Sequence, residues 1–260
     1  MCSSDLAMLE ADSATRHIVL ISKPPSPSVA KRVIDTLAHS EKPCTVCFLG
    51  ADAPSLPDNV SFARTLKAAA ELATGRSSKN KRPEFKSIIP HVTTGRQRIH
   101  GLFCGGTLSS EAQVVFLDQG VSVASNAPIP GAEAVGSGTS HVLIDLGSDE
   151  YTRGRPHPMI DPTVRDEELT KALADPTLAV ILLDVVIGFG THPDPAGTIV
   201  RVVAAAGTER PIVVASVTGT DDDPQDRRTQ MAKLVDGGIV VAPTNADAAT
   251  LALSCLVQDD

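Results

Sequence analysis

The sequence predicts an α/β protein built on open parallel sheets, and two observations support this class. Apolar runs of about four to eight residues alternate with helix-length segments, as in parallel sheets that helices cover on both faces. Residues 9–22 also align with residues 172–185, because both contain the end of a helix, an aspartate and then an apolar strand. The alignment continues through a proline-containing loop, a helix and a second strand. The chain therefore contains the same unit twice.

The second unit, residues 97–260, contains a full set of alternating elements. We expect strands in IHGLFC, VSVAS, HVLIDLG, AVILLDVVIG, IVVASV and GIVVA. Helices are expected from TLSSEAQ, around RDEELTKALA, in TIVRVVAAAGT, in QDRRTQMAKLVD and at the C-terminal end. This alternation predicts an open, flavodoxin-like parallel sheet of five or six strands.

The first unit, residues 1–75, repeats only the second half of that pattern. It contains two strands, IVLIS and CTVCFLG, on either side of the helix VAKRVIDTLAHS. A sheet lacking half of its strands exposes apolar surface, so we expect a flavodoxin-like unit that is incomplete at its N-terminus and belongs to a longer protein. Residues 76–96 are polar and basic, which predicts a linker, with an anion or partner site as the alternative. The first six residues, MCSSDL, match no helix or strand pattern, and we interpret them as extraneous to the fold.

Composition and charge exclude several classes of protein. A formal net charge of −8 gives no basic face for nucleic acid. No run of about 18 apolar residues is present to span a membrane, and the N-terminus lacks the regions of a signal peptide, so we expect a cytoplasmic protein. Five cysteines do not indicate a disulfide scaffold. Cys44 and Cys47 should point to opposite faces of one strand. Cys104 is interpreted as a buried thiol, with a nucleophile as the alternative.

The carboxyl ends of parallel strands are where open α/β sheets bind ligands. The segment Cys104-Gly105-Gly106-Thr107 joins a strand directly to a helix. Two glycines allow a ligand to approach the backbone, and the helix start offers free N–H groups, so Gly105, Gly106 and Thr107 are candidate phosphate-binding residues. The alternative is a tight turn in which Thr107 is only the N-cap of the helix.

A second loop, residues 145–161, is far longer than a usual βα connection, which favours a functional role. Arg155 is a candidate for binding an anion in a bidentate manner, and His157, held between two prolines, is a candidate proton-transfer group. A structural ion pair is the alternative for both. Asp161, before Pro162, is expected to cap the next helix. The charged residues of this loop are Asp145, Asp149, Glu150, Arg153, Arg155, His157 and Asp161.

Further candidates follow the remaining strands. Asp184 lies inside an apolar strand, so we expect its carboxylate to face a polar site or to bind loop backbone. His192 is a candidate catalytic group, and Asp194 and Asn245 are candidate substrate-binding residues at the same sheet edge. No HxH or HExxH spacing is present, so we expect no metal site. The acids Asp221, Asp222 and Asp223 precede a helix, where they favour its N-terminus. Thr244 or Asn245 is interpreted as the cap of the last helix.

Three strings in the second unit carry a resemblance to a known family. GLFCGGTLSSEA, IDLGSDEYTRGRPHPMIDP and ILLDVVIGFGTHPDPA are similar to the FdrA proteins, and residues 97–257 resemble the CoA-ligase domain of the succinyl-CoA synthetase superfamily. The resemblance implies a longer protein with a Rossmann-type, CoA-binding-like domain ahead of this segment. It also implies that the two units correspond to the α-subunit and β-subunit ligase domains. The chain departs from the synthetases because CTVCFLG is followed by ADAPSLPDN, without the phosphorylated histidine of that family.

The resemblance to FdrA proteins implies a component of a carbamoyltransferase, which uses oxamate and carbamoyl phosphate in purine and allantoin catabolism. Gly105, Gly106 and Thr107 would then hold a phosphate or carboxylate, Arg155 a second anionic group, and His157 or His192 would move a proton. No cofactor is expected, phosphate or carbamoyl phosphate would be a substrate, and CoA would enter through the preceding domain. Companion subunits are expected as partners. The alternatives are a succinyl-CoA synthetase-like acyl-CoA ligase and a non-catalytic assembly subunit.

Overall fold

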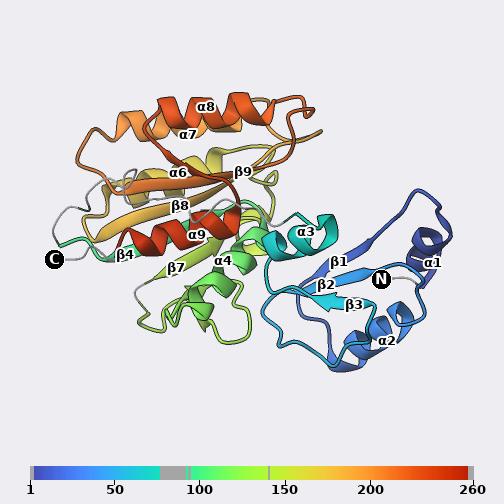
Figure 1. Ribbon diagram of the computed structural model, residues 1–260. Coiled ribbons are helices and arrows are strands. Elements are labelled where there is room, and N and C mark those ends of the chain that lie inside the picture. Colours follow the sequence, from blue (N-terminus) through green and yellow to red (C-terminus); the bar gives the residue numbers. More distant parts are fainter. Residues whose placement is uncertain (1–2, 77–91, 93–94, 140, 257–260) are drawn as a thin grey trace. The chain divides into compact units, whose positions relative to one another are not determined.

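The protein consists of two compact units, residues Met1–Lys81 and Arg82–Asp260. The computed structural model describes residues 3–76, 92, 95–139 and 141–256 (Figure 1). The predicted linker, residues 76–96, lies almost entirely outside the described residues. Within the described residues no helix has the length and apolar character needed to cross a membrane.

The first unit is a small parallel sheet in the order β1-β2-β3. The strands are β1 (Ile18–Ser22), β2 (Cys44–Phe48) and β3 (Val60–Phe62), and the helices are α1 (Ser3–Ala11), α2 (Pro27–Leu37) and α3 (Leu66–Thr74). On β1, Val19 and Ile21 remain 39% and 44% exposed, so one face of this edge strand is only partly covered. Cys44 and Cys47 pack into different apolar clusters, which confirms that they point to opposite faces of β2.

Helix α1 begins at Ser3 and so includes part of the segment MCSSDL, which matched no helix pattern in the sequence. Leu6 packs against the apolar cluster of the first unit. Lys42 Nζ donates to the carbonyl oxygens of Leu9 and Asp12 at 2.6 Å, and the Glu10 carboxylate accepts from the Glu41 amide at 3.0 Å. These contacts are long-range in sequence, so the sequence indicated only the end of this helix, in residues 9–11.

The second unit has seven parallel strands in the order β10-β9-β8-β4-β7-β5-β6, one or two more than expected. The long strands are β4 (Arg98–Phe103), β7 (Val142–Asp145), β8 (Leu178–Val186), β9 (Ile212–Thr218) and β10 (Val240–Ala242). Their order, β7-β4-β8-β9-β10, is the flavodoxin-like 2-1-3-4-5 arrangement, which confirms the predicted fold class. At the edge lie β5 (Ala124–Ser125), within the expected strand VSVAS, and β6 (Glu133–Ala134), which was not expected and whose two residues are too few for a periodic signal.

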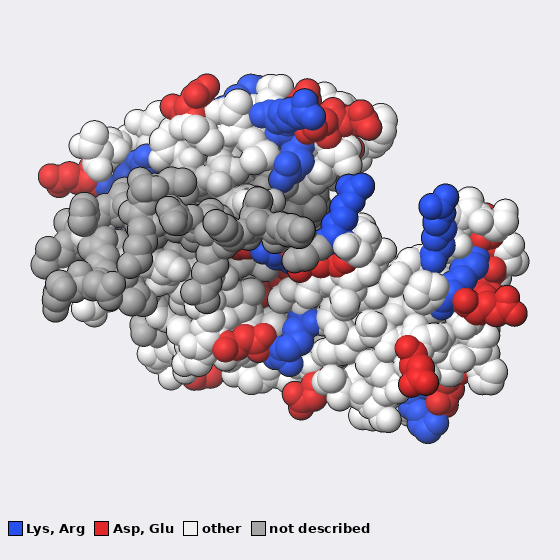
Figure 2. All heavy atoms as spheres, viewed as in Figure 1, with Lys and Arg blue, Asp and Glu red and all other residues white. Residues whose placement is uncertain are grey.

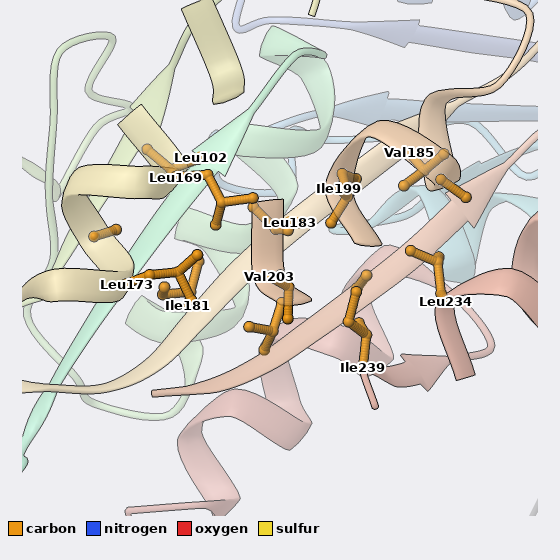
Figure 3. Packing of buried hydrophobic residues seen from close by; sticks show 14 of the residues in the cluster. Leu102, Leu169, Leu173, Ile181, Leu183, Val185, Ile199, Val203, Leu234 and Ile239 are labelled. Atoms are coloured by element: carbon orange, nitrogen blue, oxygen red, sulfur yellow. The ribbon is translucent and has the colours of Figure 1, made fainter. Parts of the chain in front are cut away.

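Helices cover both faces of this sheet. Helices α4 (Gly106–Asp118) and α9 (Asn245–Ser254) pack together on one face. Helices α6 (Thr163–Ala174), α7 (Pro195–Ala205) and α8 (Arg227–Asp236) cover the other, as Figure 1 shows. Between the sheet and α6, α7 and α8 lies a large apolar cluster, in which Leu169, Ile199 and Leu234 meet Ile181 and Leu183 of β8 (Figure 3).

The repeat predicted from the sequence is also a repeat of topology. Strands β1, β2 and β3 occur in the same order as β8, β9 and β10, with α2 and α7 as the first crossover helix in each set. As expected, the connection from β2 to β3 has no helix, whereas α8 lies between β9 and β10.

The direction of winding reverses at β4. From β4 the chain passes through α4 to β7 on one side, and then through α6 to β8 on the other. Ligands of open α/β sheets bind at such a switch point, outside the carboxyl ends of the strands. We call the carboxyl ends of β4, β7 and β8, with the loops that follow them, the carboxyl edge.

Candidate functional site

The loop after β4 is held by a carboxylate from the neighbouring strand. Asp184 on β8 is completely buried, and its two carboxylate oxygens accept from the Cys104 and Gly105 amides at 2.7 Å each. Burial raises the pKa of Asp184 to about 6, against these two hydrogen bonds and the charge of Arg165. Of the two roles expected for Asp184, the structure shows the binding of loop backbone. Residues 104–107 are called the glycine loop below.

Helix α4 begins directly at the end of the glycine loop. Its N-cap is Gly105, so the interpretation of Thr107 as the N-cap was wrong, and Thr107 lies exposed in the first helical turn. A Cβ on Gly106 would stand 2.5 Å from Asp145 Oδ2. Two carboxylates, Asp145 and Asp184, therefore already lie at the positive end of the α4 dipole. An external anion would meet only the outer rim of this helix start.

Asp145 ends β7 and is itself tightly held. Its side chain is 5% exposed, and Oδ1 accepts from the Gly147 amide at 2.9 Å. Asn126 binds the Asp145 backbone on both sides, donating to its carbonyl at 3.0 Å and accepting from its amide at 2.8 Å. Asn126 was not a sequence candidate, because a lone Asn after a two-residue strand resembles an ordinary turn residue.

His157 folds back from the long loop onto the end of β7. A Cβ on Gly147 would lie 2.6 Å from His157 Nε2, 2.9 Å from Cys104 O and 3.1 Å from Asp145 Oδ1. The imidazole thus reaches the carboxyl edge only because residue 147 has no side chain. His157 Nδ1 accepts from the Met159 amide at 3.2 Å, so in the neutral ring the proton is on Nε2.

His192, in the loop after β8, is fixed in the same manner. Its Nδ1 accepts from the Asp194 amide at 3.0 Å, so Nε2 again carries the proton of the neutral ring. Its own amide donates to the Met159 carbonyl at 2.7 Å, which joins the two histidine-bearing loops. Hydrogen bonds from Thr163 lower the pKa of Asp161 and burial raises that of Asp166, and His192 has a smaller electrostatic effect on each, so both carboxylates are near this ring.

The loop of His192 is bound to a buried glutamine that the sequence did not single out. Gln225 Oε1 accepts from the Gly188 amide at 3.0 Å, and its Nε2 donates to Gly188 O, Thr191 Oγ1 and His192 O at 3.0–3.3 Å. Gly188 has φ 145°, which favours glycine. The side chain of Phe189 is 90% exposed at the tip of this firmly held loop.

Most of the remaining candidates from the sequence make hydrogen bonds within the fold. Arg155 is exposed. The Asp161 carboxylate accepts from the Thr163 amide at 3.0 Å at the start of α6, as expected of a capping side chain. The helix starts one residue later than expected, so Pro162 holds the N-cap position. Asp194 is the N-cap of α7 and pairs with Lys233 at 2.8 Å. Asn245 joins α9 to α4, since its Nδ2 donates to Leu108 O and to Glu111 Oε2 at 2.9 and 2.8 Å. Thr244 is the cap of α9, as expected.

A buried arginine next to the glycine loop was not among the sequence candidates. Arg165 on α6 is 2% exposed. Its guanidinium donates to Cys104 Sγ, Asp184 O, Pro195 O and Thr198 Oγ1 at 3.3–3.6 Å. The one available signal was its spacing, because Arg165 precedes Leu169 and Leu173 by four and eight residues on the buried face of α6.

The chemistry of the site follows from these positions. Cys104 is buried and its pKa is raised to about 12 by desolvation, so the expectation of an inert thiol is confirmed. Within the described residues no three His, Cys, Asp or Glu side chains are grouped to hold a metal ion. The carboxyl edge instead presents two imidazole Nε2–H donors, that of His157 next to Gly147 at the end of β7 and that of His192 in the loop after β8, and such donors are suited to proton donation and to polar stabilisation of a substrate.

The description of a known family fits this part of the chain. The model of the CoA-ligase family matches residues 102–255, which include every strand and loop of the carboxyl edge. The chain belongs to the CoA-ligase family. This CoA-ligase chain is 36% identical to YahF of Escherichia coli K12, an uncharacterized protein, over an alignment that covers 95% of this chain and 52% of YahF. It therefore spans about half the length of that curated relative.

Solved structures with a similar fold are more distant in sequence. The dinucleotide-forming acetyl-coenzyme A synthetase 1 of Ca. Korarchaeum cryptofilum is 16% identical, with 98% of this chain and 56% of that chain covered and a TM-score of 0.43. The ATP citrate lyase of Methanothrix soehngenii is 12% identical, with 98% of this chain and 36% of that chain covered and a TM-score of 0.39.

Proposed function

We propose that this CoA-ligase chain provides an acyl-transfer site, at which an acyl group activated as a mixed anhydride with phosphate is passed to the thiol of CoA. The observation that carries the proposal is the pair of imidazole Nε2–H groups, at His157 and His192, on the carboxyl edge of a domain that matches the CoA-ligase family. Both rings are fixed by backbone amides before any ligand arrives, which lowers the cost of organising the site.

In this proposal the thiol sulfur forms a bond to the acyl carbon and the bond from that carbon to the phosphate oxygen breaks. The thiol proton passes to the departing phosphate, directly or through solvent, so the step needs no oxidant or reductant. His157 and His192 act as hydrogen-bond donors to the carbonyl or phosphate oxygens that gain negative charge. The exposed Thr107 hydroxyl and the exposed guanidinium of Arg155 supply the outer contacts to the anionic substrate.

The likeness to FdrA proteins implies a different reaction, carbamoyl transfer to oxamate, which is the alternative to be tested. Neither the match to the CoA-ligase family nor the identity to YahF favours this alternative. The natural full-length protein should be incubated with acetyl phosphate and CoA, with ATP, succinate and CoA, and with carbamoyl phosphate and oxamate, each with and without candidate companion subunits. We expect a CoA thioester in one of the first two mixtures. Turnover only in the third, independent of CoA, would overturn the proposal.

A further inference from the structure

Beneath the glycine loop lies a charged group that the proposed reaction does not use. Arg165 is almost fully buried, and its Nε has no hydrogen-bond partner within the described residues. Burying a guanidinium is costly unless its donors are satisfied, so a cation at this position needs a reason beyond filling space.

The contacts of Arg165 connect three separate segments of the chain. Nη1 donates to Cys104 Sγ at the end of β4 and to the backbone carbonyl of Asp184 on β8. Nη2 donates to Pro195 O and to Thr198 Oγ1 in the first turn of α7. One planar group thus spans both strands of the switch point and the helix that follows the His192 loop. A planar guanidinium can hold such divergent acceptors, whereas the point charge of a lysine cannot.

We infer that Arg165 is a positioning residue that fixes the glycine loop through Asp184. The carboxylate of Asp184 accepts from the Cys104 and Gly105 amides, and Arg165 donates to the backbone carbonyl of Asp184 and to Cys104 Sγ, so the guanidinium holds both sides of this contact. The charged or titratable groups that act on Asp184 are Arg165 from α6 and Cys104 from β4, and Asp145 from β7 acts in turn on Cys104. Thr198 of α7 is neutral.

The consequence is a predicted dependence of the loop on both charge and pH. Desolvation raises the pKa of Asp184 to about 6, and the charge of Arg165 opposes this rise. Without that charge the pKa of Asp184 should be higher still, so a larger fraction of Asp184 would be protonated near neutral pH. The Cys104 and Gly105 amides would then donate to a neutral carboxyl group, which is a weaker acceptor than a carboxylate.

The test is the pH midpoint at which the amide signals of Cys104 and Gly105 change, followed by NMR in the full chain. In Arg165→Met the midpoint should rise by about one pH unit, a tenfold change in the protonation ratio at fixed pH, with faster amide hydrogen exchange at both residues. Arg165→Lys, which keeps the charge, should have the pH midpoint of the parent but faster amide hydrogen exchange than the parent. Arg201→Met is the matched control, because Arg201 on α7 pairs with Asp166 and not with Asp184.

If Arg165→Met does not fold, Arg165→Gln provides the same comparison with a polar, neutral side chain. Equal midpoints in the parent, the neutral variants and Arg165→Lys would overturn the inference, as would an equal rise in Arg201→Met. The inference concerns the loop that the proposed function uses, but its test needs no substrate. It can therefore fail while acyl transfer is observed, and the reverse is also true.

Discussion

The backbone amide of His192 donates to the carbonyl oxygen of Met159 at 2.7 Å, which joins two loops that are 33 residues apart in the sequence. Each loop contains a His-Pro pair in which the imidazole Nδ1 accepts the amide two residues later. Proline at the middle position has no amide of its own to compete and restricts the backbone. The sequence repeats this small motif, and the fold brings both copies to one edge of the sheet.

Gly147 allows His157 to reach that edge. In Gly147→Ala the new methyl group would stand 2.6 Å from His157 Nε2 and 2.9 Å from the Cys104 carbonyl, so the ring must move away. We expect a loss of about 1–3 kcal/mol in the free energy of unfolding, as for other overpacked sites. The ring signals of His157 in an NMR spectrum should shift, while those of His192 serve as the internal control and stay in place. Unmoved His157 signals would contradict the described geometry.

Asp194 should matter to stability more than to turnover. Burial acts to raise its pKa, but hydrogen bonds from Lys233, Gln230 and the Gly197 amide outweigh this and lower it. Asp194→Ala removes the N-cap of α7 and should cost about 1–2 kcal/mol in chemical denaturation. Lys233→Met removes only a half-exposed ion pair and should cost less than about 1 kcal/mol.

The lowered pKa of Asp194 determines how the stability difference between the parent and Asp194→Ala changes with pH. Because the folded pKa of Asp194 is depressed, its contribution is fully present above the ordinary value of 3.8 and is lost as the pH falls through the lower folded value. The stability gap between the parent and Asp194→Ala should therefore narrow only in strong acid. A gap that closes already near neutral pH would assign the effect to another group.

The surroundings of His100, on the central strand β4, predict a loss of stability in acid. Burial and then the charge of Arg98 depress its pKa, and its buried Nε2 has no hydrogen-bond partner among the residues that the structure describes. The unfolded chain therefore binds a proton near pH 6.5 that the folded chain takes up only at lower pH, so stability falls as the pH drops below 6.5.

The variant His100→Leu should remove this acid sensitivity. It should be more stable than the parent by about 1 kcal/mol at pH 5, because an unsatisfied polar atom is replaced by an apolar group. The raised pKa of Asp184 has the opposite sign and stabilises the folded state in acid, but it is common to both proteins and cancels in their difference. An unchanged difference between pH 5 and pH 8 would contradict the assignment.

The two units should differ in their ability to fold alone. Residues 97–260 contain every strand of the seven-stranded sheet and its large apolar cluster, whereas residues 1–75 contain three strands with Val19 and Ile21 exposed on β1. We expect a cooperative thermal transition from the isolated second unit and none from the first. A sharp transition from residues 1–75 alone would show that the small sheet needs no further neighbours.

Charged side chains of both signs lie on the face of the molecule drawn in Figure 2, where the described acidic and basic residues are interspersed.

The sequence predicted the elements whose signals are local. Continuous apolar runs located β4, β8 and β9 because both faces of each are buried, and the internal repeat predicted that the first unit has the elements of the second half of the other. The sequence located only the end of α1, whose position depends on Lys42 and Glu10 contacts far apart in sequence, and it missed β6, which is two residues long.

The site was harder to predict because its parts depend on tertiary contacts. Strand ends located Asp145, His157 and His192, but no pattern predicted that Asp184 would occupy the amides assigned to a phosphate. Arg165 and Gln225 were missed for the same reason. Each is a polar residue in a polar segment, and only folding buries it against the backbone of the carboxyl edge.

The most direct test of the proposed function compares two substitutions of His157 in the natural full-length protein, assayed for CoA thioester formation from acetyl phosphate or from succinate and ATP. His157→Asn keeps an acceptor for the Met159 amide but removes the Nε2–H group, whereas His157→Gln keeps a donor near the Nε2 position. We expect both to retain the parental free energy of unfolding within about 1 kcal/mol, as for substitutions outside cores. His157→Asn should lower the rate of thioester formation at least roughly 100-fold, and His157→Gln should retain more of it. Thioester formation at the parental rate in a well-folded His157→Asn variant would contradict the proposed role of this edge.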